Sequence, residues 1–319
     1  MPKNKFQFAQ DVDAGLKSNP KYLSSKYFYD EKGDILFQQI MNLEEYYLTR
    51  SEYETFTLHK EEWHDTFSKG VDRFNLIEFG AGDAYKTKVL LNHFVDKNAN
   101  FNYIPIDISG NVLDFLHKKL AQEIPKLSVT PIQADYFKAF DNIKQSSNSR
   151  NIILFLGSNI GNFTPSVAID FFGKLKSKCG PNDYVLIGVD QKKDPNKILA
   201  AYNDSKGVTE SFNKNVLVRI NKELGGNFEP DNFIFFPTYN PLSGEVRSYL
   251  VSKSNQSVFI KALNNSYSIK AFESIFTEIS KKYSLDEISK LADNTGFEVV
   301  NHYTDSKNRF INTLWKPKS

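Results

Sequence analysis

The stretch Asn75-Leu-Ile-Glu78-Phe-Gly80-Ala-Gly82-Asp-Ala-Tyr85-Lys86 decides the fold of this chain. Its apolar run predicts a buried strand, and its glycines allow the backbone to turn tightly and to approach a ligand. A helix that begins after the turn presents unpaired N–H groups, which attract an anion. The stretch therefore predicts a strand, a ligand-binding turn and a helix in succession.

The segments that follow predict that this strand belongs to a larger sheet. Continuous apolar runs at 151–156 and 184–189 are typical of strands that are covered on both faces. We expect two more strands at 103–107 and 127–132, although each contains a proline, which favours strand ends and edges. Strands that alternate with helices predict an α/β fold with a doubly wound, mostly parallel sheet. Apolar residues recur at helical spacing at 86–94 and 112–121, which predicts helices there.

The C-terminal residues predict the end of the same sheet. Ser284 and Glu287 have the spacing of a capping box, in which each side chain binds the backbone N–H of the other residue. Gly296 is placed to end the helix that this box begins. Two strand-like runs at 297–303 and 310–315 then predict an antiparallel hairpin.

Residues 229–281 have a different pattern. Prolines separate short runs of β-prone residues, which favours antiparallel strands. Because this block lies between the fifth unit of the sheet and the capped helix, we interpret it as an insertion that forms a second domain. We expect a cofactor-binding domain at 56–192 and 282–319, and an α+β substrate-binding domain at 1–55 and 193–281.

The composition excludes several classes of protein. The 319 residues include 40 Lys and Arg against 38 Asp and Glu, and a net charge of +2 argues against nucleic-acid binding. The single cysteine, Cys179, excludes an intrachain disulfide and a cysteine-cluster zinc site, and no other metal-ligand spacing is present. The apolar runs are far shorter than the roughly 20 residues that span a bilayer. We expect a cytoplasmic monomer that binds a small molecule and neither metal nor membrane.

The residues around the glycine turn restrict the class of ligand that can bind there. A dinucleotide fingerprint requires a third glycine where this chain has Tyr85, so we exclude a pyrophosphate ligand. Asp107 ends the second strand, where an acid can accept hydrogen bonds from both hydroxyls of a ribose. With Glu78 before the turn and Asp135 after the third strand, the pattern resembles the class I S-adenosylmethionine-dependent methyltransferases. Their Rossmann-like sheet ends in the same antiparallel hairpin.

Longer motifs follow one another along nearly the whole chain, from about Leu16 to Trp315. They are Lys26-Tyr-Phe-Tyr-Asp30, Glu45-Tyr-Tyr-Leu-Thr-Arg50, Phe155-Leu-Gly-Ser-Asn-Ile-Gly-Asn162, Ala201-Tyr-Asn-Asp204 and Thr277-Glu-Ile-Ser280. This ordered set resembles the histidine-specific N-alpha-methyltransferases of ergothioneine biosynthesis. The resemblance implies methylation of the α-amine of L-histidine, up to N,N,N-trimethylhistidine (hercynine), with S-adenosylmethionine as cofactor.

The resemblance also implies which residues bind the amino acid. Tyr29, Asn162 and Tyr202 would hold its amine and carboxylate. Tyr46 would lie near the imidazole, and the ring nitrogens would bind Glu278 and Ser280. Alternate residues of an extended segment point the same way, so Glu278 and Ser280 can face one pocket.

The same resemblance implies which residues bind the cofactor. Asp107 would hold the ribose, and Asp135 with the backbone of Tyr136 would hold the adenine. The full set of implied cofactor residues is Gly80, Gly82, Lys86, Asp107, Asp135 and Tyr136. We assign no general base, because none of the five histidines lies in a matched motif.

The chain departs from the family pattern at a few positions. Ser248 stands where bacterial members commonly have a methionine beside the imidazole, and Asn159 replaces a threonine. These changes leave two alternatives open. One is an α-N-methyltransferase for another aromatic amino acid or a tryptophan-derived amine, and the other is a non-catalytic relative that only binds the cofactor.

Overall fold

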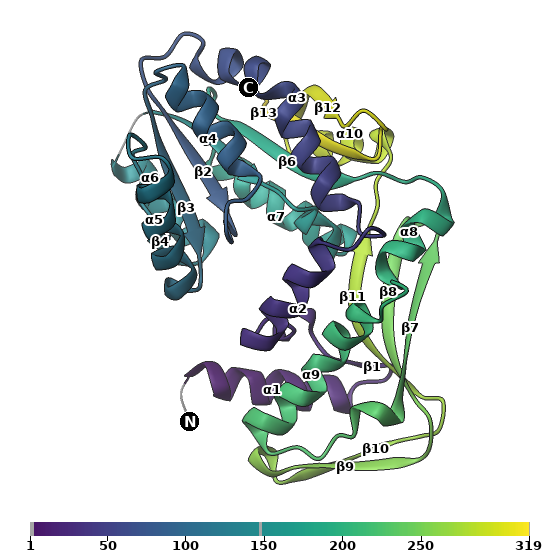
Figure 1. The fold of residues 1–319 in the computed structure, drawn as a ribbon. Coiled ribbons are helices and arrows are strands. Elements are labelled where there is room, and N and C mark those ends of the chain that lie inside the picture. The colour runs from purple at the N-terminus through teal and green to yellow at the C-terminus, as the bar shows by residue number, and fades with distance from the viewer. Residues whose placement is uncertain (1–2, 147–148, 319) are drawn as a thin grey trace. The chain divides into compact units, whose positions relative to one another are not determined.

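The computed structural model describes residues 3–146 and 149–318, and the chain divides into two compact units (Figure 1). The sheet unit consists of Leu48–Lys192 and Lys282–Ser319. The insertion unit consists of Met1–Tyr47 and Lys193–Lys281. Each unit has its own apolar core.

The sheet unit contains a doubly wound sheet with the strand order β12-β13-β6-β5-β2-β3-β4. The strands from β4 to β6 pair in parallel, and β13 pairs antiparallel with both β6 and β12. The predicted α/β class, with its mostly parallel sheet and closing hairpin, is confirmed. The strands are β2 (Phe74–Phe79), β3 (Phe101–Asp107), β4 (Ile132–Gln133), β5 (Arg150–Phe155), β6 (Tyr184–Asp190), β12 (Phe297–Thr304) and β13 (Phe310–Pro317).

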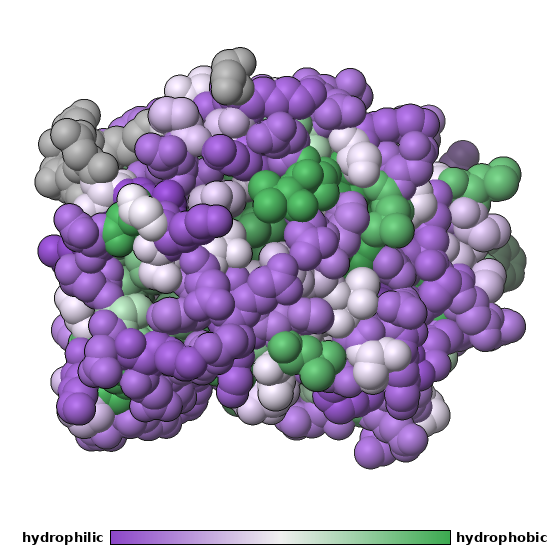
Figure 2. All heavy atoms as spheres, turned by 90° about the horizontal axis from the view of Figure 1, so that it is seen from above, coloured by the Kyte–Doolittle hydropathy of each residue, from purple (hydrophilic) through white to green (hydrophobic). Residues whose placement is uncertain are grey.

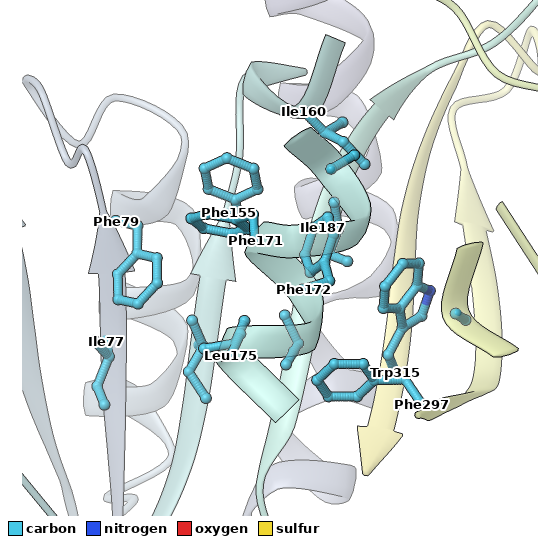
Figure 3. Packing of buried hydrophobic residues seen from close by; sticks show 14 of the residues in the cluster. Ile77, Phe79, Phe155, Ile160, Phe171, Phe172, Leu175, Ile187, Phe297 and Trp315 are labelled. Carbon is cyan, nitrogen blue, oxygen red and sulfur yellow. The ribbon is translucent and has the colours of Figure 1, made fainter. Parts of the chain in front are cut away.

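Helices cover both faces of this sheet because successive strand residues point to opposite sides. Ile77 packs in a core with α6 (Tyr136–Ser146), α7 (Pro165–Lys178) and α10 (Leu285–Asn294). Its neighbour Leu76 packs in a second core, whose helices are α3 (Leu48–Ser68), α4 (Thr87–Asp96) and α5 (Gly110–Glu123). Figure 3 shows the first core, in which Phe155, Phe171, Phe172 and Trp315 fill the space between α7 and the strands.

The strand predicted at 127–132 is present but shorter than predicted, since β4 comprises only Ile132 and Gln133. Before it, the chain meets β3 at a single bridge, where Tyr103 N–H donates to Ser128 and Thr130 N–H donates to Tyr103. Pro131 then lacks the N–H group that would continue the ladder. Pro105 is tolerated within β3 because its backbone nitrogen, which has no proton to donate, faces the same side as that of Tyr103. On that side the pairing with the chain before β4 is irregular.

The capped C-terminal helix is confirmed in detail. Ser284 Oγ accepts a hydrogen bond from Glu287 N at 3.2 Å, and Glu287 Oε2 accepts one from Ser284 N at 2.8 Å. Gly296 follows the C-cap with a φ of 81°, a left-handed conformation that favours glycine. Local sequence spacing alone therefore fixed the start and end of α10.

The insertion unit contains the predicted antiparallel strands. Its main sheet has the order β1-β11-β8-β7, in which β11, β8 and β7 pair antiparallel and β1 pairs parallel with β11. Apolar side chains of α9 (Val208–Leu224) pack against Leu250 and Ile275 on one face of this sheet. The strands are β1 (Lys21–Tyr22), β7 (Phe233–Asn240), β8 (Glu245–Ser252), β9 (Gln256–Ile260), β10 (Asn265–Ile269) and β11 (Ser274–Lys281). The helices are α1 (Lys3–Lys17), α2 (Glu31–Met41), α8 (Pro195–Tyr202) and α9 (Val208–Leu224), with short 3-10 turns η1 (Ser25–Tyr27), η3 (Pro230–Asn232) and η4 (Lys261–Leu263).

The N-terminal boundary of the sheet unit differs from the sequence prediction. Residues 48–55 were expected in the substrate-binding domain, but they form the first turns of α3. This helix continues unbroken to Ser68, and its Phe56 and Trp63 are fully buried in a core of the sheet unit. Because the helix is continuous, its first turns belong to the same unit as its buried C-terminal part.

The outer surface seen in Figure 2 is mostly hydrophilic, with apolar side chains in separate small groups. Within the described residues, we find no helix long and apolar enough to cross a membrane.

Candidate functional site

The glycine turn that follows β2 has the backbone conformation that the sequence predicts. Gly80 and Gly82 have φ values of 72° and 52°, in the left-handed region that only glycine adopts without strain. Gly80 has a second constraint, because a Cβ atom there would lie 2.9 Å from Tyr136 Oη. A Cβ atom at Gly82 would meet nothing within 4 Å, so the turn is open to close approach at that residue.

Three of the predicted cofactor residues lie at one edge of the sheet. β2, β3 and β4 are adjacent and parallel, and Gly80, Asp107 and Asp135 lie at or just beyond their carboxyl ends. Asp107 Oδ1 accepts a hydrogen bond from Ser109 N at 2.9 Å, and Asp135 Oδ1 accepts one from Phe137 N at 3.0 Å. These local bonds fix the two carboxylates at the edge where open α/β sheets bind ligands.

Tyr136 closes one side of the turn. Its ring stacks on Phe79 with a centroid distance of 4.7 Å and an interplanar angle of 1°. Burial raises the pKa of its hydroxyl to about 12, and the charges of Asp107 and Asp135 add to that shift. Tyr136 is therefore an uncharged hydroxyl at neutral pH.

Two buried carboxylates lie near Lys86. Glu52 of α3 forms an ion pair with Lys86, which is the N-cap residue of α4. Glu78 of β2 accepts hydrogen bonds from Thr87 Oγ1 at 2.7 Å and Tyr103 Oη at 2.5 Å. Burial raises the pKa of Glu78 to about 7, although both hydrogen bonds act in the opposite direction. Lys86 thus lies beside the buried Glu52 carboxylate, and its positive charge acts to lower the pKa of Glu78.

Sequence reasoning missed Glu52. The signal was its spacing, because it lies four residues after Leu48 and four before Phe56 on a helix. That period places Glu52 on the buried face of α3, where a carboxylate requires partners.

Asn162 lies in the sheet unit at the end of the 3-10 turn η2 (Asn159–Asn162), and its side chain is exposed. It does not cap the next helix, because Thr164 Oγ1 accepts the capping hydrogen bond from Val167 N at 3.4 Å. The turn follows β5, so Asn162 lies beyond the carboxyl end of a strand that neighbours β2.

The insertion unit brings the other five predicted substrate residues together. Tyr202, the last residue of α8, is buried, and its hydroxyl lies 2.7 Å from Ser280 Oγ in β11. The rings of Tyr46 and Tyr202 lie 6.3 Å apart. The ring of Tyr29 packs against Phe37 and Phe212, although 43% of the residue is exposed. Desolvation of its hydroxyl raises the pKa of Tyr29, and the negative charge of Glu278 adds to that rise.

Glu278 lies on β11 directly opposite Ser248 of β8. A bulge between Phe276 and Glu278 shifts the register, and the hydroxyl of the extra residue Thr277 shares its proton between Asn213 Oδ1 at 2.8 Å and Ser248 O at 3.0 Å. The Ser248 hydroxyl is buried and has no hydrogen-bond partner among the described residues. Paired residues on adjacent strands project to the same face, so Ser248 faces the same side as Glu278.

No group of three or more metal-ligating side chains occurs within the ranges 3–146 and 149–318. The five predicted substrate residues of the insertion unit carry four hydroxyls and one carboxylate. Neutral donors of this kind can bind an amino acid by hydrogen bonds without placing a strong cation beside a sulfonium.

Comparisons with known proteins identify the family to which the chain belongs. It is 32% identical over 301 residues to the histidine N-alpha-methyltransferase of Mycolicibacterium smegmatis, an alignment that covers 94% of this chain and 92% of the relative. The enzyme of the same name from Mycobacterium tuberculosis is 31% identical with the same coverage. The ergothioneine biosynthesis protein 1 of Neurospora crassa is 31% identical over 314 residues, covering 95% of this chain and 34% of that longer protein.

The sequence model of one family matches residues 8–317, a range that contains most of both units and each of the predicted site residues. The chain therefore belongs to the histidine-specific, S-adenosylmethionine-dependent methyltransferase family.

Proposed function

We propose that this protein transfers methyl groups from S-adenosylmethionine to the α-amine of L-histidine, up to N,N,N-trimethylhistidine. The observation that supports histidine as the substrate is the cluster of Tyr202, Ser280 and Glu278 in the insertion unit. The Glu278 carboxylate and the Ser280 hydroxyl, two residues apart on β11, match the two nitrogens of an imidazole ring, and the Ser280 hydroxyl contacts that of Tyr202. The known activity of relatives about 30% identical over nearly the whole chain supports the same substrate.

S-adenosylmethionine, when bound, supplies a methyl group on a positively charged sulfur. In each transfer the nitrogen lone pair forms the new N–C bond, the S–C bond breaks, and its electron pair stays on sulfur. The amine must be unprotonated and in line with the S–CH₃ bond. The chain therefore contributes mainly position, which accounts for a large part of the rate in such reactions.

Residues of the sheet unit are assigned to the cofactor. Asp107 accepts from the ribose hydroxyls, and Asp135 with the backbone of Tyr136 binds the adenine. Gly80 and Gly82 let the backbone approach the ligand, and Lys86 lies at the end of that turn. The placement of Asp107 and Asp135 at adjacent strand ends supports this assignment.

The remaining predicted residues are assigned to the amino acid. Tyr29, Tyr202 and Asn162 hold the amine and carboxylate, and Tyr46 lies near the imidazole. Glu278 accepts from one ring nitrogen, while the Ser280 hydroxyl engages the other. The raised pKa of Tyr29 keeps its hydroxyl protonated, which suits a hydrogen-bond donor and not a proton-accepting base. The amine's proton leaves to water.

The decisive experiment is incubation with L-histidine and isotopically labelled S-adenosylmethionine, followed by mass spectrometry. Labelled mono-, di- and trimethylhistidine are the expected products. Cofactor binding without any methylhistidine would refute the substrate. A parallel panel with tryptophan, tyrosine and tryptamine tests the alternative amines, and binding with no turnover on any of them would identify a non-catalytic relative.

We also propose that the enzyme acts as a cytoplasmic monomer, without nucleic acid or a membrane. The near-neutral charge of +2 supports the absence of nucleic-acid binding, because it provides no strong attraction to phosphates. Light scattering at assay concentration tests the oligomeric state, and a mass twice 36.6 kDa would contradict it.

A further inference from the structure

Glu52 is a buried carboxylate at which several segments of the sheet unit meet. Its side chain is 1% exposed and forms an ion pair with Lys86, which follows the glycine turn after β2. Both of its oxygens accept from Gly157 N, at 3.1 and 3.0 Å, in the loop after β5. Asn312 Nδ2 of β13 donates to Oε1 at 3.3 Å. One side chain of α3 therefore ties together two strand-end loops and a neighbouring strand.

The sheet is shaped to admit this carboxylate. Gly188 of β6 pairs in register with Asn312, and a Cβ atom at Gly188 would overlap Glu52 Oε1. Gly188 needs no special backbone conformation, so close approach of Glu52 is the physical reason for a glycine here. Asn312 must turn its amide nitrogen toward Glu52, because a carboxylate can only accept.

The Lys86 ammonium lies over the loop that carries Asn162. Lys86 Nζ is 3.5 Å from the position of a Cβ atom on Gly157. Gly157 and Ser158 have φ values of 73° and 57°, and the left-handed conformation is costly for a serine. The loop is held by Glu52 at Gly157 and by Asp190 N, which donates to Ser158 Oγ at 3.2 Å. Glu52 thus fixes the first residue of the segment that ends in Asn162.

A lysine ammonium has three donors and no acceptor, so one contact to Glu52 leaves donors for a second anion. The Lys86 side chain is 20% exposed, which leaves part of it accessible. S-adenosylmethionine has a single anionic group, the carboxylate of its methionyl part. We propose that Glu52 is a positioning residue that holds the Lys86 ammonium for this carboxylate and fixes the Gly157 loop beside it. The proposal rests on the cofactor role assigned to Lys86.

Calorimetric titration with two ligands tests the idea. S-adenosylhomocysteine and 5′-methylthioadenosine share the thioadenosine part, and only the first carries the amino-acid end. Glu52→Gln should weaken S-adenosylhomocysteine about tenfold and change 5′-methylthioadenosine by less than about twofold. Lys86→Met should show the same selectivity, and the double variant should be no weaker than Lys86→Met alone, because the two residues act through one contact.

Glu61→Gln is the matched control, because Glu61 lies on the same helix in an exposed ion pair with Lys97. It should bind both ligands like the wild type. Gly188→Ala is a second probe that displaces the Glu52 carboxylate without removing its charge, and it should reproduce the selective loss.

Three results would overturn the proposal. They are unchanged or tighter binding of S-adenosylhomocysteine by Glu52→Gln, equal losses for both ligands, and losses that multiply in the double variant. Equal losses would indicate a purely structural role for Glu52. Histidine turnover by the wild type is measured separately, so failure of the proposed substrate would leave these binding ratios intact.

Discussion

The hydroxyl of Tyr202, at the end of α8, lies 2.7 Å from the hydroxyl of Ser280 in β11. The two residues are 78 positions apart in the chain, and both are buried. A hydroxyl that bonds to a second hydroxyl has a fixed orientation, so its remaining lone pair or proton points in a defined direction. In the proposed site this contact links the group that binds the carboxylate to one that binds the ring.

Ser280→Ala should therefore raise the KM for L-histidine about tenfold, because one ring nitrogen and the Tyr202 hydroxyl each lose a partner. The KM for S-adenosylmethionine should stay near the wild-type value. Steady-state kinetics with each substrate varied in turn measure both. Ser257→Ala, at an exposed serine of β9 in the same unit, is the control and should leave both constants unchanged. A rise confined to the cofactor KM would contradict the role given to Ser280.

Glu278→Ala should remove the preference for histidine. An analogue without ring nitrogens leaves the wild-type carboxylate unpaired, and this penalty disappears with the carboxylate. We expect the ratio of kcat/KM for histidine over tryptophan to fall by about tenfold or more. Titration with S-adenosylhomocysteine should give a wild-type Kd. Collapse of that binding would show that Glu278 supports the cofactor instead.

Glu78 makes the stability of the sheet unit depend on pH. Its pKa of about 7 lies above the ordinary value of 4.5, so the folded state binds the proton more tightly than the unfolded chain does. The free energy of unfolding must therefore decrease as pH rises through the window from about 4.5 to 7. Between pH 6 and pH 8 we expect the wild type to lose about 1 kcal/mol more than Glu78→Gln.

Urea unfolding of both proteins at the two pH values measures this difference. The comparison cancels the other titrating groups, which the two proteins share. A wild-type chain that loses no more stability than Glu78→Gln would show that Glu78 is already ionised in the folded state at pH 6.

Gly80→Ala should destabilise the protein by about 1–3 kcal/mol, because alanine is strained at a φ of 72°. Part of the cost comes from the Tyr136 hydroxyl, which lies 2.9 Å from the new Cβ position. The double variant Gly80→Ala, Tyr136→Phe should recover that part and leave the backbone strain. Denaturant melts of the two single variants and the double variant form a cycle. Additive losses would show that the hydroxyl does not meet the alanine methyl.

The sequence by itself determined the local elements of this protein. The glycine turn at Gly80, the capping box at Ser284 and the acids at Asp107 and Asp135 follow from spacing over a few residues, where backbone geometry leaves few choices. The ordered motifs, from Lys26 to Ser280, were enough to indicate the family.

Only the tertiary structure decided how distant segments meet. It shortened β4 to two residues, because Pro131 interrupts a ladder that depends on β3, and it assigned the first turns of α3 to the sheet unit through their packing. It also placed Glu52 against Gly157, 105 residues away, and against Asn312, 260 residues away. A buried carboxylate on a helix face is visible in a sequence, but its partners depend on which strands lie beneath that face. Those neighbours are set by long-range packing, which no local pattern encodes.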